Sequence, residues 1–207
     1  MKRNKFSRGA AFTLLELLVV MLILGLMTAL VLPSAVGLVG SSQFNQGMNF
    51  VVGQLKYARQ LAMSENNTVE VRFYRYADPN GVTGNSGIRA MQLWRGNPGG
   101  MRTPVDRLYR FPGSLVISAD SRVTRLGEAL NSASLTASEI IGTLPSGYQF
   151  YAFQFRPDGT TSLTSGSNYF TLITETDPAR HAGQGLPANF AAVQIETFTG
   201  TVRVFRP

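Results

Sequence analysis

A long apolar block close to the N-terminus constrains this chain more than any other feature. From Leu17 to Val39 no residue is charged, and the only hydroxyl side chains are those of Thr28 and Ser34. A helix needs about 20 predominantly apolar residues to cross the hydrocarbon core of a bilayer, and this block supplies 23. The block therefore predicts a membrane-spanning helix near the start of the chain.

Basic residues precede this block. Four of the 19 lysines and arginines lie within the first eight positions, and no acidic residue comes before Glu16. By the positive-inside rule, this arrangement predicts a cytoplasmic N-terminus, one pass through the membrane and a C-terminal part on its other side. An ordinary secretory signal peptide is the alternative, but its apolar region has only about 7–15 residues. The longer block favours a membrane helix.

The same basic residues account for more than half of the net charge. The formal charge is +7, which taken alone suggests nucleic-acid binding. Without those four residues, 15 basic side chains face 12 acidic ones and a charge of +3 remains. The chain has no cysteine, so disulfides and thiolate metal sites are excluded.

Directly after the basic segment comes the sequence Phe12-Thr13-Leu14-Leu15-Glu16. It resembles the processing site of type IV prepilins and type II secretion pseudopilins. In that family a prepilin peptidase cuts before the phenylalanine and methylates the new N-terminus. The resemblance implies a leader of residues 1–11, cleavage between Ala11 and Phe12, and N-methylation of Phe12. The family usually has glycine where this chain has Ala11, so we expect slower processing.

Three residues of the predicted helix match positions that the family uses in assembly. Glu16 becomes the fifth residue of the processed chain, and Gly25 and Pro33 fall where many pilins carry a glycine and a proline. A charge deep in a bilayer costs about 2.5–3.5 kcal/mol on insertion scales. Either Glu16 reaches the membrane interface, or it pairs with the amine of Phe12 on a neighbouring subunit and sets the register of a filament. The resemblance favours the pairing.

The helix is expected to continue beyond the apolar block to about Asn66. Apolar residues recur there at spacings of four and three, which marks one face of a helix. We therefore predict a filament-core helix over 12–40, an amphipathic continuation over 41–66 and a β-rich head over 67–207. The apolar positions are Phe44, Met48, Val51, Leu55, Ala58 and Ala62.

In the head the apolar period changes toward two, which predicts an antiparallel β-rich domain and, with the helix, an α+β fold. A turn-rich loop at 78–81 should join the first two strands, and 177–189 should form a surface loop. A short helix is expected over 128–141. The predicted strands are 69–73, 88–94, 108–111, 115–118, 148–155, 169–174, 191–198 and 201–205.

Two short segments carry a narrower resemblance. Residues 55–62, followed by Asn66 and a strand, look like the helix end of the GspH/FimT group of minor pseudopilins and minor pilins. Residues 155–159, Phe-Arg-Pro-Asp-Gly, are similar to the hairpin in the head of that group. There is a looser likeness to the pilin-like proteins of Verru_Chthon cassettes.

The sequence does not favour an enzyme, a cofactor or a metal site. His181 is the single histidine and lies in a polar segment, so no nucleophile, base and orienting group can be named together. The glycines at 96, 99 and 100 lack the lysine and hydroxyl of a phosphate loop.

We therefore predict that the protein is a non-enzymatic minor pseudopilin or minor pilin and a subunit of a type II secretion or type IV pilus-like filament. The resemblance implies as partners the prepilin peptidase, other pilin-like subunits and an inner-membrane assembly platform, with membrane lipid before assembly. The alternative is a minor pilin that binds DNA for uptake, with Arg203 and Arg206 as candidate contacts to phosphate. Against it, charges on an edge strand also discourage aggregation.

Overall fold

The computed structural model divides the chain into two compact units, Met1–Ser42 and Gln43–Pro207. For residues 30–39, which are helical, the structure describes the backbone and not the side chains. The structure describes residues 12–77, 86–96, 102–113, 115–118, 120, 122–126, 141, 143–145, 148–166, 168–175 and 189–206.

One helix, α1 (Leu14–Glu65), runs through both units. At its start, the hydroxyl of Thr13 accepts a hydrogen bond from the backbone N–H of Glu16 at 3.2 Å, as expected of an N-cap threonine with glutamate three residues later. At its end, Asn66 adopts a left-handed φ of 49°, and Asn67 N donates to Ala62 O. This is a Schellman ending, so local sequence fixes both ends of the helix.

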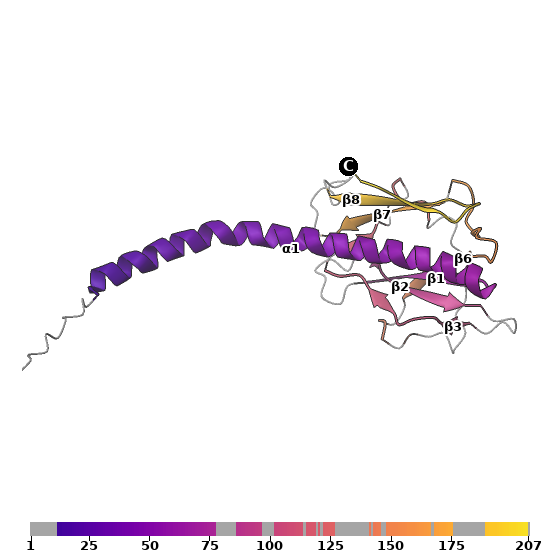
Figure 1. Cartoon of the computed structure of the whole chain (residues 1–207), viewed down its shortest axis with the longest axis horizontal. Helices are drawn as coiled ribbons and strands as arrows, with labels where there is room; N and C mark the ends of the chain where they lie inside the picture. The colour runs from indigo at the N-terminus through magenta and orange to yellow at the C-terminus, as the bar shows by residue number, and fades with distance from the viewer. Residues whose placement is uncertain are drawn as a thin grey trace, which may run out of the picture. The chain divides into compact units, whose positions relative to one another are not determined.

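In the second unit, α1 lies against the sheet with one face buried (Figure 1). All six positions of the predicted apolar stripe are buried, and none is more than 7% exposed. They pack with Val69, Val71 and Phe73 of the first strand in one hydrophobic cluster. The spacing of four and three therefore identified the core-facing side of this part of the helix.

The head is built on one sheet in which all the recorded strand pairs are antiparallel. The order is β6-β1-β2-β5-β7-β8-β9, and the two short strands β3 and β4 also pair with β2. The predicted α+β class is confirmed. The strands are β1 (Val69–Ala77), β2 (Ser86–Arg95), β3 (Thr103–Pro104), β4 (Tyr109–Arg110), β5 (Leu115–Ile117), β6 (Gln149–Phe155), β7 (Tyr169–Thr174), β8 (Phe190–Ile195) and β9 (Val202–Phe205).

Each of the eight predicted strands has a counterpart, and β1 continues four residues beyond the predicted end, to Ala77. The strand predicted over 191–198 ends at Ile195, because residues 197–199 form a turn that closes on Gly200 with a φ of 64°. Strand β3 was not predicted, since a pair of residues carries no periodicity. The predicted short helix falls largely on residues 127–140 and the predicted loop with His181 on residues 176–188, both outside the described residues.

The second face of the sheet is also covered. Along β1, alternate residues turn to opposite faces, so Tyr74 and Tyr76 belong to a second cluster with Ala90, Leu144 and Phe150. The pairing of β1 with β2 shifts after Tyr74, where Arg89 is the extra residue of a bulge. Both faces of the central strands are therefore buried.

The membrane-spanning segment predicted between Leu17 and Val39 is not confirmed. Among the residues that the structure describes, no helix combines the length and the apolar character needed to cross a membrane.

Two glycines of α1 offer a test of how closely the helix packs on the sheet. A Cβ added at Gly47 would overlap Leu115 and lie 3.0 Å from Pro112, whereas one added at Gly53 would meet nothing within 4 Å. We expect Gly53→Ala to raise the free energy of unfolding by about 0.5–1 kcal/mol, and Gly47→Ala to lower it by about 1–3 kcal/mol through overpacking. Urea unfolding of the full chain in mild detergent measures the free energy of unfolding of both variants. Equal changes in the two variants would show that α1 packs less closely on Leu115 and Pro112 than the structure indicates.

Candidate functional site

The N-terminal residues with predicted roles lie at the start of α1. Ala11 lies outside the described residues, while Phe12 is 76% exposed and Glu16 lies in the first helical turn. A Cβ at Gly25 would meet no atom within 4 Å. The helix continues through Pro33, whose side chain is not described. The assembly roles of these residues stay predictions.

Within the first unit, residues 17–24 of α1 present an apolar surface in every direction. Each residue from Leu17 to Leu24 is a large apolar residue, and each is exposed by more than 40%. Consecutive residues of a helix point about 100° apart, so this run covers the whole circumference. A helix that is apolar all round is normally buried, and this stretch therefore needs a partner of low polarity.

The two C-terminal arginines differ in their surroundings. Arg203 is an exposed residue of β9. Arg206 donates from Nη2 to Asn45 Oδ1 at 2.7 Å, and its guanidinium lies 6.0 Å from the centre of the Phe44 ring. It also donates to Met48 Sδ. Arg206 therefore ties the end of the chain to α1, and the structure does not present the two arginines as one free basic pair.

A second arginine ties the other end of β9 to the same helix. Arg59 Nε donates to Thr199 O at 2.7 Å. Asn45 and Arg59 are separated by about 21 Å along the helix, and an extended chain from Thr199 to Arg206 spans about 23 Å. The strand therefore lies alongside the helix in the antiparallel direction, held at both ends.

The two segments that resemble the GspH/FimT group meet at Arg59. A Cβ at Gly200 would overlap Gly159 O and lie 3.0 Å from Arg59 Cδ, and a Cβ at Gly159 would lie 3.5 Å from Arg59 Nη2. Both glycines have positive φ, of 83° at Gly159 and 64° at Gly200. The turn at 156–160 thus lies against the helix and the β8–β9 turn, a contact that neither segment alone could indicate.

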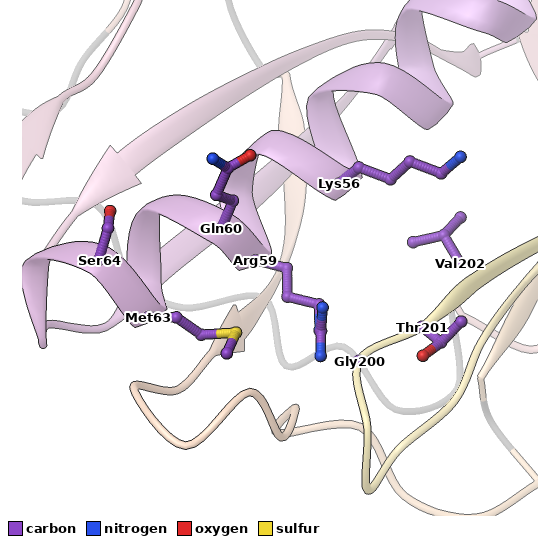
Figure 2. Close-up of a pocket in the computed structure, with 8 residues that line it drawn as sticks. All are labelled: Lys56, Arg59, Gln60, Met63, Ser64, Gly200, Thr201 and Val202. Atoms are coloured by element: carbon purple, nitrogen blue, oxygen red, sulfur yellow. The ribbon is translucent and has the colours of Figure 1, made fainter.

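Beside the contact of Arg59 with Thr199 lies a groove, which we call the β9 groove (Figure 2). It has a volume of about 750 Å³. Figure 2 shows the helix residues on one side and the β8–β9 hairpin on the other. The lining residues are Lys56, Arg59, Gln60, Met63, Ser64, Gly200, Thr201 and Val202.

On the opposite face of the sheet, Glu70 is the centre of a buried polar cluster. Its carboxylate accepts from Arg72 Nε at 2.5 Å and Gln154 Nε2 at 3.2 Å, and forms an ion pair with Arg102 at 3.1 Å. Glu70 is only 5% exposed and Arg72 is fully buried. The alternation of Val69 to Phe73 indicated polar side chains on one face, but it gave no sign that this face is buried as well.

Aromatic rings complete this cluster. The guanidinium of Arg72 lies over the rings of Trp94 and Phe150, at 4.3 and 4.9 Å from their centres. Trp94 Nε1 donates to Tyr74 Oη at 3.1 Å, and Tyr74 Oη donates to Gln92 Oε1 at 3.4 Å. Burial raises the pKa of Tyr74 to about 12. Hydrogen bonds and stacked rings thus offset the cost of burying these polar groups, which indicates a structural role.

The raised pKa of Tyr74 predicts a loss of stability at high pH. Between its unfolded pKa of 10.0 and its folded pKa of about 12, the unfolded chain releases the phenolic proton and the folded chain keeps it. The free energy of unfolding should fall by about 2–3 kcal/mol over this interval. Chemical unfolding at a series of pH values measures the decline. Most of it should be lost in Tyr74→Phe, where the pKa of Tyr109, which burial also raises, leaves a smaller decline. The full decline should persist in Tyr57→Phe, and an equal decline in both variants would refute the assignment.

The part of the chain that the structure describes contains no candidate metal-binding site. No three histidine, cysteine or acidic side chains gather there in a way that could hold a metal ion.

In comparisons with known proteins, no protein-family model matches the chain, and no curated protein matches its sequence. Among solved structures, the chain is similar to a crystal structure of the type IV minor pilin FimU from Pseudomonas aeruginosa strain PAO1. The TM-score is 0.44 at 13% sequence identity, and the match covers 80% of this chain and 93% of that chain. A likeness at this level does not assign a family to the chain.

Proposed function

We propose that this chain is a pilin-like structural subunit, a minor pseudopilin or minor pilin without enzymatic activity. A prepilin peptidase processes it between Ala11 and Phe12, and it assembles through its N-terminal helix into a type II secretion or type IV pilus-like filament. The observation that carries the proposal is the helix itself. One stripe of α1 is buried in the head, whereas Leu17 to Leu24 expose large apolar side chains all round.

An apolar surface of this kind suits a helix that is surrounded by similar helices. Apolar area removed from water contributes about 25 cal/mol per Å², and large exposed apolar patches mark sites of protein or membrane interaction. The buried stripe of the second unit already has its partner in the sheet. The apolar residues 17–24 of the first unit are exposed, and helices of neighbouring subunits would cover them in a filament.

Glu16 supplies specificity in this proposal. It is the acidic residue of the first turn of α1, four residues after the exposed Phe12 whose amine cleavage would release. A carboxylate that leaves water is costly unless it is paired with an opposite charge. Pairing Glu16 with the Phe12 amine of a neighbouring subunit would satisfy both groups in one axial register.

The proposal includes an inner-membrane stage before assembly, with a cytoplasmic N-terminus and a periplasmic head. Its support is the sequence pattern of four basic residues ahead of an uncharged block. The partners would be membrane lipid, the prepilin peptidase, other pilin-like subunits and the inner-membrane assembly platform.

Substitutions of Glu16 test the assembly role. The backbone N–H of Glu16 is capped by Thr13, and glutamine replaces glutamate equally well in a capping box. Glu16→Gln should therefore keep the helix start but remove the charge. We expect both Glu16→Gln and Glu16→Ala to reduce incorporation into filaments at least about tenfold. Immunoblotting of sheared filaments measures incorporation.

Thr13→Ala is the matched control, because it removes the helix cap and leaves the charge of Glu16. We expect it to assemble at close to the native level. Native incorporation of Glu16→Gln would show that Glu16 acts only as part of the helix start, and the pairing would then be wrong.

The processing step makes a separate prediction. Mass spectrometry of the mature chain should find an N-methylated N-terminus at Phe12. Because the family resemblance favours glycine before the cut, Ala11→Gly should increase the rate of processing, measured by the mass shift over time after induction. A mature chain that begins at Met1 or Ala10 would refute the junction.

A further inference from the structure

The open edge of the sheet at β9 and the adjoining groove have no role in assembly through the N-terminal helix. We propose that this surface binds an extended segment of another polypeptide. The segment pairs with β9 as an additional strand and places an acidic side chain beside Lys56. The surface lies within the second unit, Gln43–Pro207, and the inference does not depend on the proposed function.

The hydrogen bonds of the β8–β9 hairpin fix which backbone groups of β9 face outward. Glu196 N donates to Thr201 O at 2.9 Å, so the backbone C=O group of Thr201 is directed toward β8. Backbone groups of successive residues in a strand point to opposite sides. The N–H and C=O groups of Val202 and Val204 are therefore directed away from β8, toward the open edge.

The hydrogen bonds of β8, the strand that pairs with β9, support this orientation of the Val202 backbone groups. Ile195 pairs with Val202 across the β8–β9 ladder. Its own N–H donates to Asn168 O at 2.8 Å, and its C=O accepts from Asn168 Nδ2 at 3.0 Å. Since the backbone groups of Ile195 turn away from β9, those of Val202 turn away from β8. Four backbone groups, two donors and two acceptors, thus lie along the edge.

The other edge of the sheet is treated differently. At β6, Ser162 N donates to Gln154 O at 2.9 Å, and Gln154 N donates to Ser162 Oγ at 2.9 Å. Phe155 and Thr161 form a further bridge. The chain thus covers part of its β6 edge, whereas no residue in the described ranges hydrogen-bonds to Val202 or Val204 at the β9 edge. An uncovered edge is a template for an added strand.

The β9 groove supplies positive charge next to this edge. Lys56 and Arg59 line it, and its lining contains no carboxylate. Among the described residues, Lys56 has no ion-pair partner, and Arg59 uses Nε for Thr199. Figure 2 shows both side chains extending from the helix on the side of Gly200 and Val202. An acidic side chain of an added strand could pair with Lys56 there.

This geometry favours a polypeptide over a nucleic acid. Addition of a strand satisfies donors and acceptors together, whereas a phosphate offers acceptors only and would leave the outward C=O groups of Val202 and Val204 unpaired. Arg206, which would otherwise strengthen phosphate binding, is held by Asn45 at 2.7 Å. The ligand class is therefore an extended segment in which acidic and apolar side chains alternate.

Titration of the full chain in mild detergent with labelled probes tests the inference. The probes are peptides of about eight residues, the length of a long strand. In one, valine alternates with glutamate, and in the other with lysine. A duplex DNA of similar length is the third probe. We expect the glutamate peptide to bind at least about tenfold more tightly than either other probe, as followed by fluorescence anisotropy.

Two matched pairs of variants locate the site. Lys56→Glu should weaken binding of the glutamate peptide at least about tenfold, whereas Arg107→Glu, an equal change of charge on an exposed loop, should leave it unchanged. Val204→Pro removes an outward N–H that the β8–β9 ladder does not use, and proline is tolerated at such edge positions. It should abolish binding, while Val204→Thr should retain it. Circular dichroism checks that each variant is folded.

Failure of the glutamate peptide to bind would overturn the inference. So would equal binding of the lysine peptide, tighter binding of duplex DNA, or equal effects of Lys56→Glu and Arg107→Glu. Unchanged binding in a folded Val204→Pro variant would exclude strand addition at β9.

Discussion

Burial of one apolar stripe of α1 against the sheet is the contact on which the head depends. Val51, Leu55, Ala58 and Ala62 are fully buried and share one cluster with alternate residues of β1 and with residues of β7 and β8. The sheet needs this helix because the helix-facing side chains of its central strands are large and apolar, and no disulfide contributes to the head. Gly47 permits the close approach, and Arg59 and Arg206 fasten β9 to the same helix.

The same helix has two different surfaces along its length, and this difference underlies the proposed function. In the second unit it is amphipathic, with its apolar stripe matched to the sheet. In the first unit, residues 17–24 are large, apolar and exposed all round the helix. A one-sided apolar face is satisfied by one partner, whereas an all-round apolar surface needs several neighbours or lipid. A subunit that packs beside copies of related helices meets that need.

Polar groups in the head are placed where they add specificity. Glu70, Arg72 and Tyr74 are buried on the face of the sheet opposite α1, where ion pairs, hydrogen bonds and aromatic rings hold them in one arrangement. The two edges of the sheet differ from each other. Residues 161–162 cover part of the β6 edge, whereas the backbone groups of Val202 and Val204 face outward at the β9 edge. The proposed binding surface at β9 follows from this asymmetry.

The sequence by itself determined the elements whose information is local. The spacing of Phe44 to Ala62 identified the buried helix face, and alternation located most strands. Tertiary structure decided what depends on distant residues. Periodicity could not show that the polar side of β1 is buried, because the groups that bury Arg72, such as Trp94 and Phe150, come from other strands. The attachment of Arg206 to Asn45 and the meeting of Arg59 with Gly159 and Gly200 likewise join residues far apart in the chain. Only the fold brings them together, because a side chain's partners are set by packing and not by its neighbours in sequence.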